Sequence, residues 1–206
     1  DSEREHFFFV PNLHALTVRP DPVELKRNSR SAVAWLLACG VDHDHSYIFM
    51  QSQVPAHSEL TWILNNYATI GELNRMTQFK DKASKAGAEG QLVGYYDYPV
   101  MMAADILLYD ADEVPVGEDQ KQHVELTRDI ATRFNNLHGE TFIVPEPTIQ
   151  KEGARIMNLQ DPTRKMSKSD LDDSGNILLS DDDNTIEKKI MRAVTDSGSA
   201  VAAGAD

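Results

Sequence analysis

The stretch that decides the fold spans residues 6–51, HFFFVPNLHALTVRPDPVELKRNSRSAVAWLLACGVDHDHSYIFMQ. Its two ends, His6–Val10 and Tyr47–Gln51, are short apolar runs with several aromatic residues, which is typical of buried strands. Between them, Asp21 and Pro22 provide a helix cap and a first helical residue, and an apolar helical repeat follows. A strand, a helix and a strand at this spacing predict a βαβ unit with parallel strands.

Helical and strand patterns continue to alternate after this unit. Helices are predicted over Ser58–Tyr67, Gly71–Met76, Tyr98–Tyr109, Asp119–Leu137 and Asn184–Val194, and strands over Glu113–Val116 and Thr141–Val144. The polar, glycine-containing stretch Lys80–Gly94 is predicted to be a loop. The alternation indicates an α/β fold in which helices flank a parallel sheet.

Composition excludes several classes of protein. Hydrophobic residues make up 41% of the 206 residues and charged residues 26%, which is typical of a soluble globular protein. The apolar runs are too short to span a bilayer. A single cysteine, Cys39, excludes an intrachain disulfide. The formal net charge of −13 argues against a general nucleic-acid or membrane coat, although it allows a local basic site.

The sequence lacks the glycine-rich motifs of P-loop and dinucleotide-binding proteins and the nucleophile elbow of α/β-hydrolases. His43 and His45 have a spacing that a metal site can use, but two solvated histidines in a polar turn are the favoured interpretation. We therefore predict no protein metal site, and a catalytic chemistry that works by positioning and charge stabilisation.

Three constellations are candidates for a site, and each has an ordinary structural alternative. Lys165-Met166-Ser167-Lys168-Ser169 can surround a polyphosphate with ammonium and hydroxyl donors, or it can be a basic surface loop. Gly117–His123, GEDQKQH, directly follows a predicted strand, where a ligand can approach the backbone and free N–H groups, or it can simply be a helix start. Met102, Asp105 and Ile106 share one helical face, and Asp105 either meets a donor there, faces solvent or caps a neighbouring helix.

Taken together, these segments closely resemble bacterial tryptophanyl-tRNA synthetases, which are class I aminoacyl-tRNA synthetases. The resemblance rests on YPVMMAADILLYDADEVPVGEDQKQHVELTRDIATRFN, GARIMNLQDPTRKMSKS and TIEKKIMRAVTDS, and it extends from Phe7 to Ser197. KMSKS is the signature loop of the class. A tyrosine-specific relative is expected to carry Gln where Met102 stands, so tyrosine is the weaker assignment. The resemblance implies a Rossmann-type parallel sheet.

The resemblance also implies roles for individual residues. Asp105 accepts the hydrogen bond of the indole N–H, and Tyr98 and Gln120 hold the α-ammonium group. The other substrate-binding residues that it implies are Met102, Ile106, Val114, Val116 and His14. The residues that it implies for ATP are Gly117, Glu118, Asp119, Ile156, Lys165, Met166, Ser167, Lys168 and Ser169. Lys165, Lys168 and Lys82 are the implied catalytic cations.

The implied reaction is ATP-dependent activation of L-tryptophan, followed by transfer of the acyl group to tRNA(Trp). The carboxylate of tryptophan attacks the α-phosphate and pyrophosphate leaves, so the substrate supplies the nucleophile. The implied cofactors are ATP and the Mg²⁺ that it carries. A cytoplasmic homodimer is implied, without a membrane partner.

One departure from the family pattern leaves an alternative open. The second class I signature, a His-x-Gly-His type motif, does not occur in the sequence. In the family it precedes the strand that opens this chain, and a C-terminal helical domain follows. We therefore expect an interior piece of a longer enzyme that activates tryptophan poorly by itself, with an incomplete Rossmann-type domain over 1–178 and the start of a helical region over 179–206. The alternative is a non-catalytic synthetase-like protein that binds tryptophan or a partner.

Overall fold

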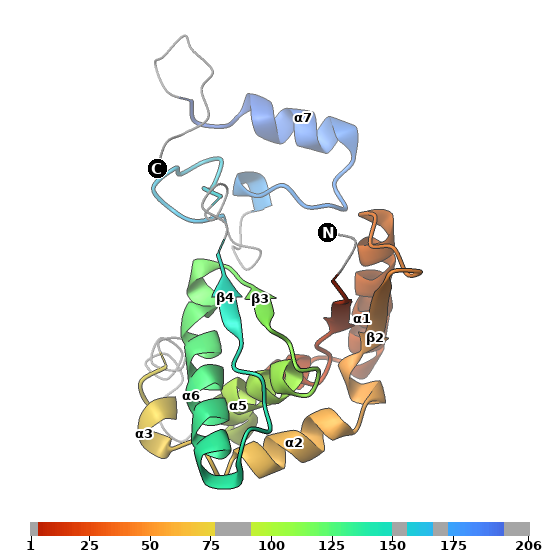
Figure 1. Cartoon of the computed structure of the whole chain (residues 1–206). Helices are drawn as coiled ribbons and strands as arrows, with labels where there is room; N and C mark the ends of the chain where they lie inside the picture. Colours follow the sequence, from red (N-terminus) through yellow and green to blue (C-terminus); the bar gives the residue numbers. More distant parts are fainter. Residues whose placement is uncertain (1–3, 77–91, 150–155, 167–172, 196–206) are drawn as a thin grey trace. The chain divides into compact units, whose positions relative to one another are not determined.

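The computed structural model describes residues 4–76, 92–149, 156–166 and 173–195 (Figure 1). The chain divides into two compact units, Asp1–Thr148 and Ile149–Asp206. The domains predicted from the sequence, 1–178 and 179–206, use another boundary and stay a prediction. Within the described parts, no helix is both long enough and apolar enough to cross a membrane.

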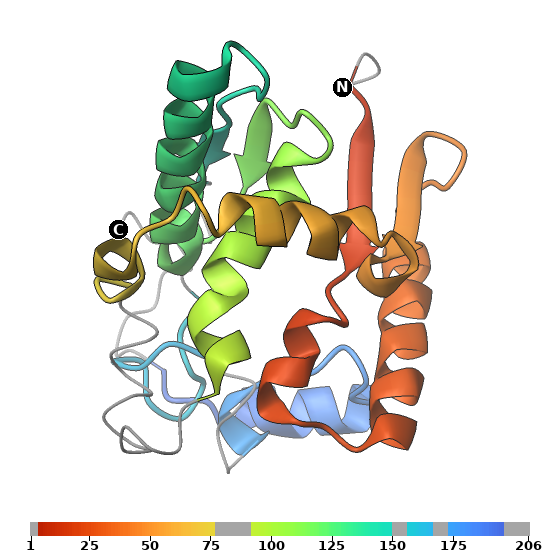
Figure 2. The same cartoon turned by 90° about the horizontal axis from the view of Figure 1, so that it is seen from below.

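The first unit begins with the predicted βαβ arrangement. Strand β1 (His6–Val10) and strand β2 (Ser46–Met50) are parallel and pair in register from His6 with Ser46 to Val10 with Met50. Figure 2 shows the two strands side by side, with helix α1 (Pro22–Ala38) in the connection between them. The parallel pairing predicted from the sequence is confirmed.

Local chemistry sets the ends of these elements. Asp21 caps α1, because its Oδ1 accepts hydrogen bonds from the backbone N–H groups of Val23 and Glu24 at 2.9 and 3.0 Å. Strand β2 ends at Met50, one residue before the predicted end, since Gln51 starts the short 3₁₀ turn η2 (Gln51–Gln53). This difference matters, because Gln51 has a role in the candidate site.

Helix α5 (Val93–Leu107) connects the other helices of the first unit. It packs against α2 (Ala56–Leu64) on one side and α6 (Lys121–His138) on the other (Figures 1 and 2). It starts within the predicted loop Lys80–Gly94, most of which lies outside the described residues. Because α5 is buried along much of its length, the side chains that it carries are held firmly in place.

The predicted strand Thr141–Val144 is wrong, and the structure shows the reason. A second parallel pair is formed by β3 (Glu113–Pro115) and β4 (Glu146–Thr148), a few residues further on. The side chain of Asn135 accepts from the backbone N–H of Phe142 at 2.9 Å and donates to its carbonyl at 2.8 Å. The backbone N–H and carbonyl of Phe142 are thereby satisfied without a neighbouring strand.

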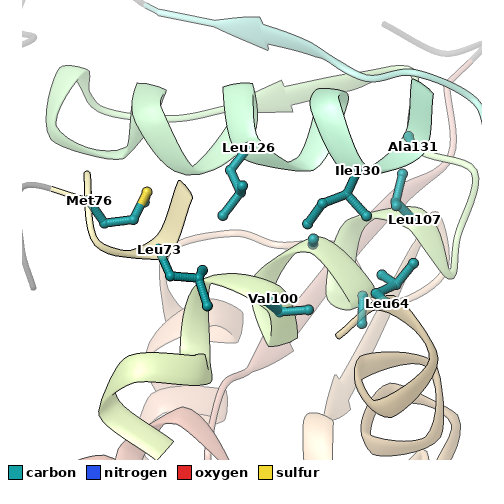
Figure 3. Packing of buried hydrophobic residues seen from close by; sticks show 10 residues of the cluster. Leu64, Leu73, Met76, Val100, Leu107, Leu126, Ile130 and Ala131 are labelled. Carbon is teal, nitrogen blue, oxygen red and sulfur yellow. The ribbon is translucent and has the colours of Figure 1, made fainter. Parts of the chain in front are cut away.

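The hydrophobic core of the first unit lies between α2, α3 (Ile70–Leu73), α5 and α6. Figure 3 shows side chains from these elements pointing toward one another. The cluster comprises Leu64, Leu73, Met76, Val100, Ala103, Ala104, Leu107, Leu126, Ile130 and Ala131. This close-packed cluster fixes α5, the helix of the candidate site, relative to α2 and α6.

A polar contact holds α3 against α6. Thr69 and Glu72 form a capping box at the start of α3, and Oε1 of Glu72 accepts from Nη2 of Arg133 at 2.5 Å. Burial of Glu72 raises the pKa of its carboxyl, but hydrogen bonds from Arg133 and Thr69 outweigh that effect, and the pKa lies below its ordinary value. The charged form of Glu72 is therefore the one that stabilises the fold.

We expect Glu72→Gln to lower the free energy of unfolding by about 1 kcal/mol at pH 7. The folded-state pKa is below the unfolded one, so this contribution is present at neutral pH and is lost as the pH falls through the folded pKa. Thermal unfolding at pH 7 and at pH 3.5 measures the difference. Glu125→Gln, an exposed change on α6, is the control. A difference that grows on acidification would contradict the prediction.

In the second unit, residues 156–166 fold back on themselves. Met157 and Lys165 form an antiparallel bridge, and the backbone N–H of Asn158 donates to the carbonyl of Arg164 at 2.8 Å. Helix α7 (Asp183–Met191) belongs to the same unit, and its cap Asp182 accepts from the N–H of Thr185 at 2.7 Å. The helix predicted over Asn184–Val194 is thus present, and it begins one residue earlier and ends at Met191.

Candidate functional site

The candidate site is organised around the carboxylate of Asp105, which lies near the end of α5 and is only 4% exposed. His57 Nδ1 lies 2.6 Å from its Oδ1, and His14 Nε2 lies 2.8 Å from its Oδ2. Gln51 Nε2 donates to both oxygens, at 2.8 and 2.9 Å. A buried carboxylate is costly unless donors surround it, and here three side chains meet that need.

The three donors come from different parts of the first unit. His14 opens the 3₁₀ turn η1 (His14–Val18) after β1, Gln51 opens η2 after β2, and His57 lies in the first turn of α2. Both short turns therefore follow the carboxyl ends of parallel strands, which is where α/β sheets place ligand-binding groups. Of the alternatives that the sequence left open for Asp105, the structure shows that the carboxylate meets donors rather than facing solvent or capping a helix.

A cavity of about 400 Å³ opens beside Asp105. Its lining includes residues that the resemblance assigns to the amino-acid substrate, namely His14, Tyr98, Met102, Asp105 and Gln120. Aromatic and apolar side chains complete it, among them Phe9 and Tyr95. An apolar cavity of this size with a few converging polar groups is typical of a small-molecule site.

The other predicted substrate-binding residues are not part of the lining of this cavity. Ile106 and Val114 line a second cavity of about 570 Å³, which also has Asp105 and residues of β1 and β3 in its lining. Val116 follows β3, where its backbone N–H donates to the carbonyl of Thr148 at 3.0 Å. The roles predicted for these residues at the indole ring therefore stay predictions.

Tyr98 lies between the cavity and His123, with its hydroxyl 2.8 Å from His123 Nε2. Burial, with the charge of Tyr95 adding to it, raises the pKa of Tyr98 to about 12. Burial also lowers the pKa of His123, against the opposing effect of Asp119. At neutral pH an uncharged phenol and an uncharged imidazole therefore stand here, and neither repels a cationic ammonium group.

The GEDQKQH segment forms a tight turn into α6. Gly117 precedes the 3₁₀ turn η4 (Glu118–Gln120), and its carbonyl accepts from the N–H of Gln120 at 2.9 Å. A Cβ at Gly117 would lie 2.9 Å from Oδ1 of Asp119, at the end of an exposed side chain that can shift. Glu118 and Asp119 are both exposed in this turn.

In the second unit, the structure brings together residues that the resemblance assigns to ATP. The backbone N–H of Met166 donates to the carbonyl of Ile156 at 2.8 Å, and Lys165 belongs to the neighbouring bridge. Ile156 is 56% exposed, so its side chain is available to a ligand. The remaining predicted residues, Lys82, Ser167, Lys168 and Ser169, lie outside the described residues.

The sequence analysis missed Gln51 and His57 as partners of Asp105. Both are fully buried polar residues, and each lies just after an apolar strand or at the start of a helix. No local pattern distinguishes such a residue from an exposed one, because the donor and the carboxylate are 54 and 48 residues apart.

Comparison with known proteins agrees with this arrangement. The sequence profile of the family described as tRNA synthetases class I (W and Y) matches residues 1–205. The tryptophan--tRNA ligases of Clostridium tetani and Caldanaerobacter subterraneus are 58% and 57% identical to the chain over 191 and 195 residues. Those alignments cover 93% and 95% of this chain, and 56% and 59% of the relatives, so the chain spans a little over half of their length.

Solved structures show the same relationship. The tryptophanyl-tRNA synthetase of Mycoplasma pneumoniae matches 92% of this chain and 56% of its own, with a TM-score of 0.85 and 44% identity. The enzyme of Campylobacter jejuni, complexed with ADP and tryptophan, matches 92% of this chain and 57% of its own, with a TM-score of 0.80 and 42% identity. The Rossmann-type α/β fold implied by the resemblance is confirmed by these similarities. With the matching profile, they show that the chain belongs to the class I tRNA synthetases of the tryptophan and tyrosine group.

Proposed function

We propose that the protein activates L-tryptophan with ATP and transfers the tryptophanyl group to tRNA(Trp). The observation that carries the proposal is the buried Asp105 carboxylate in the lining of an apolar cavity. An indole N–H is a donor without acceptor capacity, so a site that selects it needs an acceptor set among apolar groups. Met102 in the same lining, where a tyrosine-specific relative is expected to carry Gln, favours tryptophan over tyrosine.

The first unit supplies the amino-acid contacts in this proposal. Asp105 accepts the indole N–H, while Tyr98 and Gln120 hold the α-ammonium group. His14, Met102, Ile106, Val114 and Val116 surround the ring. Neutral Tyr98 and His123 support this assignment, because they leave the ammonium group without a competing positive charge.

The ATP contacts in this proposal are those that the resemblance implies. Gly117, Glu118 and Asp119 contact the ribose, and Ile156 contacts the adenine. Residues 165–169 hold the phosphates, with Lys165, Lys168 and Lys82 meeting the charge that develops on the leaving pyrophosphate. Mg²⁺ accompanies ATP as part of the substrate. No activated nucleophile is needed, since the tryptophan carboxylate attacks the α-phosphate and the resulting adenylate acylates the tRNA.

The resemblance further supports a homodimer that acts in the cytoplasm, where protein synthesis consumes charged tRNA. The Campylobacter jejuni enzyme was solved with ADP and tryptophan, which shows that a relative binds a nucleotide and this amino acid. The competing function is that of a synthetase-like protein that binds tryptophan without activating it.

Exchange of labelled pyrophosphate into ATP separates the two functions. With the intact protein, we expect exchange that requires tryptophan and is far weaker with tyrosine. Binding of tryptophan without exchange would establish the non-catalytic alternative. Exchange that is equally fast with tyrosine would contradict the assignment of tryptophan as the amino-acid substrate.

A further inference from the structure

The carboxylate of Asp105 already uses its full acceptor capacity. Oδ1 receives His57 Nδ1 and Gln51 Nε2, and Oδ2 receives His14 Nε2 and Gln51 Nε2. A carboxylate offers about four lone-pair sites to donors. A ligand N–H can therefore reach Asp105 only if one of these donors gives way.

The three donors differ in how easily a ligand N–H can displace them from Asp105. The side chain of His14 is 19% exposed and lines the cavity. Gln51 and His57 are fully buried and are not part of that lining. Gln51 is also held at its other end, because its Oε1 accepts from the backbone N–H of Leu13 at 3.0 Å. His14 is thus the donor that a ligand in the cavity can replace. Gln51 and His57 bind Asp105 from outside the cavity lining.

His57 is itself fixed by two polar partners. Its Nδ1 lies 2.6 Å from Asp105, which only accepts, so Nδ1 carries the proton. Its Nε2 lies 2.8 Å from the hydroxyl of Tyr109. Burial raises the pKa of Tyr109, with the charge of Asp105 adding to it, so the phenol keeps its proton. Both ring nitrogens of His57 therefore have a polar partner.

Aromatic packing restricts the ring of His57 as well. Its centroid lies 5.8 Å from that of Phe9, 6.0 Å from that of Phe49 and 5.5 Å from that of Tyr109. These residues belong to β1, β2 and the segment after α5, so three elements set the ring plane. Such double support, by packing and by hydrogen bonds, is what holds a functional group in one orientation.

We propose that His57 is a positioning residue for amino-acid selection: it anchors Oδ1 of Asp105, so that Oδ2 stays available on the cavity side when His14 yields to the indole N–H. The inference rests on the proposed function, since it specifies how the site selects a donor-bearing ring. His57 itself does not touch the ligand. Its effect reaches the ligand only through the Asp105 carboxylate.

Two substitutions at His57 separate the hydrogen bond from the packing. His57→Phe keeps an aromatic ring among Phe9, Phe49 and Tyr109 but removes the donor to Asp105. His57→Asn loses the ring but offers a side-chain N–H close to the position of Nδ1. Tyr109→Phe is a milder third variant, because it removes only the hydroxyl that is the partner of His57 Nε2.

The readout is the preference for tryptophan over its analogue with sulfur in place of the ring nitrogen, measured as kcat/KM in pyrophosphate exchange with the intact protein. We expect His57→Phe to reduce this preference about tenfold, through a raised KM for tryptophan and with little change for the sulfur analogue. His57→Asn should retain most of the preference, and Tyr109→Phe should lower it by less than His57→Phe. His45→Phe, at an exposed histidine outside the cavity lining, should leave the preference unchanged.

General damage to the fold would lower kcat/KM for both amino acids alike. An unchanged preference in His57→Phe would therefore overturn the inference, and so would an equal loss of preference in His57→Phe and His57→Asn. Both results leave the proposed function standing, because the parent protein still shows tryptophan-dependent exchange. A parent protein without such exchange would overturn the proposed function, and the inference with it.

Discussion

Replacing Asp105 with alanine is expected to abolish most of the preference for tryptophan over its sulfur analogue. When the sulfur analogue displaces His14 from Oδ2 of Asp105 in the parent site, it supplies no donor in return. The cost is roughly 1.5–3 kcal/mol, or about ten- to hundredfold in kcat/KM. Without the carboxylate, that cost disappears and tryptophan itself binds less well. The ratio of kcat/KM for tryptophan to kcat/KM for the sulfur analogue should therefore fall toward one.

The experiment is a double-difference measurement with two amino acids and two proteins. Because each preference is a ratio within one protein, loss of active protein cancels. This matters, since Asp105→Ala leaves the buried donors of Gln51 and His57 without their partner, and each such donor costs about 1–3 kcal/mol of stability. Thermal unfolding should be recorded in parallel, and Asp105→Asn, which keeps one acceptor oxygen, gives a less disruptive second variant.

Asp129→Ala, at an exposed carboxylate on α6, is the matched control and should leave the preference intact. The same preference for the nitrogen-containing ring in Asp105→Ala and in the parent would remove Asp105 from the amino-acid pocket. It would also remove the main chemical reason for assigning tryptophan.

Lys168→Ala is expected to slow adenylate formation by about a hundredfold. The residue lies outside the described residues, so this prediction rests on the KMSKS sequence and its resemblance. An ammonium group that meets charge developing on the leaving phosphates stabilises the transition state more than the bound substrates, and its loss lowers kcat with little effect on the KM for tryptophan. Pyrophosphate exchange at varied tryptophan and ATP concentrations separates the two parameters.

Lys26→Ala, an exposed lysine on α1, controls for the change in net charge and should leave both parameters unchanged. A variant at Lys168 that raised the KM for tryptophan while kcat stayed constant would show that this lysine does not have the proposed role.

Periodicity and cap residues in the sequence were enough to predict the elements that depend on near neighbours. Strand β1 has its predicted range and helix α1 begins at the predicted residue, because aromatic clustering and the Asp21-Pro22 cap act within a few residues. The strand predicted at Thr141–Val144 failed because the side chain of Asn135, on α6, satisfies the backbone of Phe142. No pattern within that apolar run reveals such a contact.

The sequence by itself also determined the family, and with it Asp105, Tyr98, Met102, Gln120 and His14 as candidates for one pocket. Only the tertiary structure decided how Asp105 is held. Its partners His14, Gln51 and His57 are 91, 54 and 48 residues away in the chain, and they reach it because two strands, a helix and their connecting turns converge on one end of α5. Burial of a carboxylate demands donors from any element that can supply them, and this demand depends on distances in space rather than on spacing in the sequence.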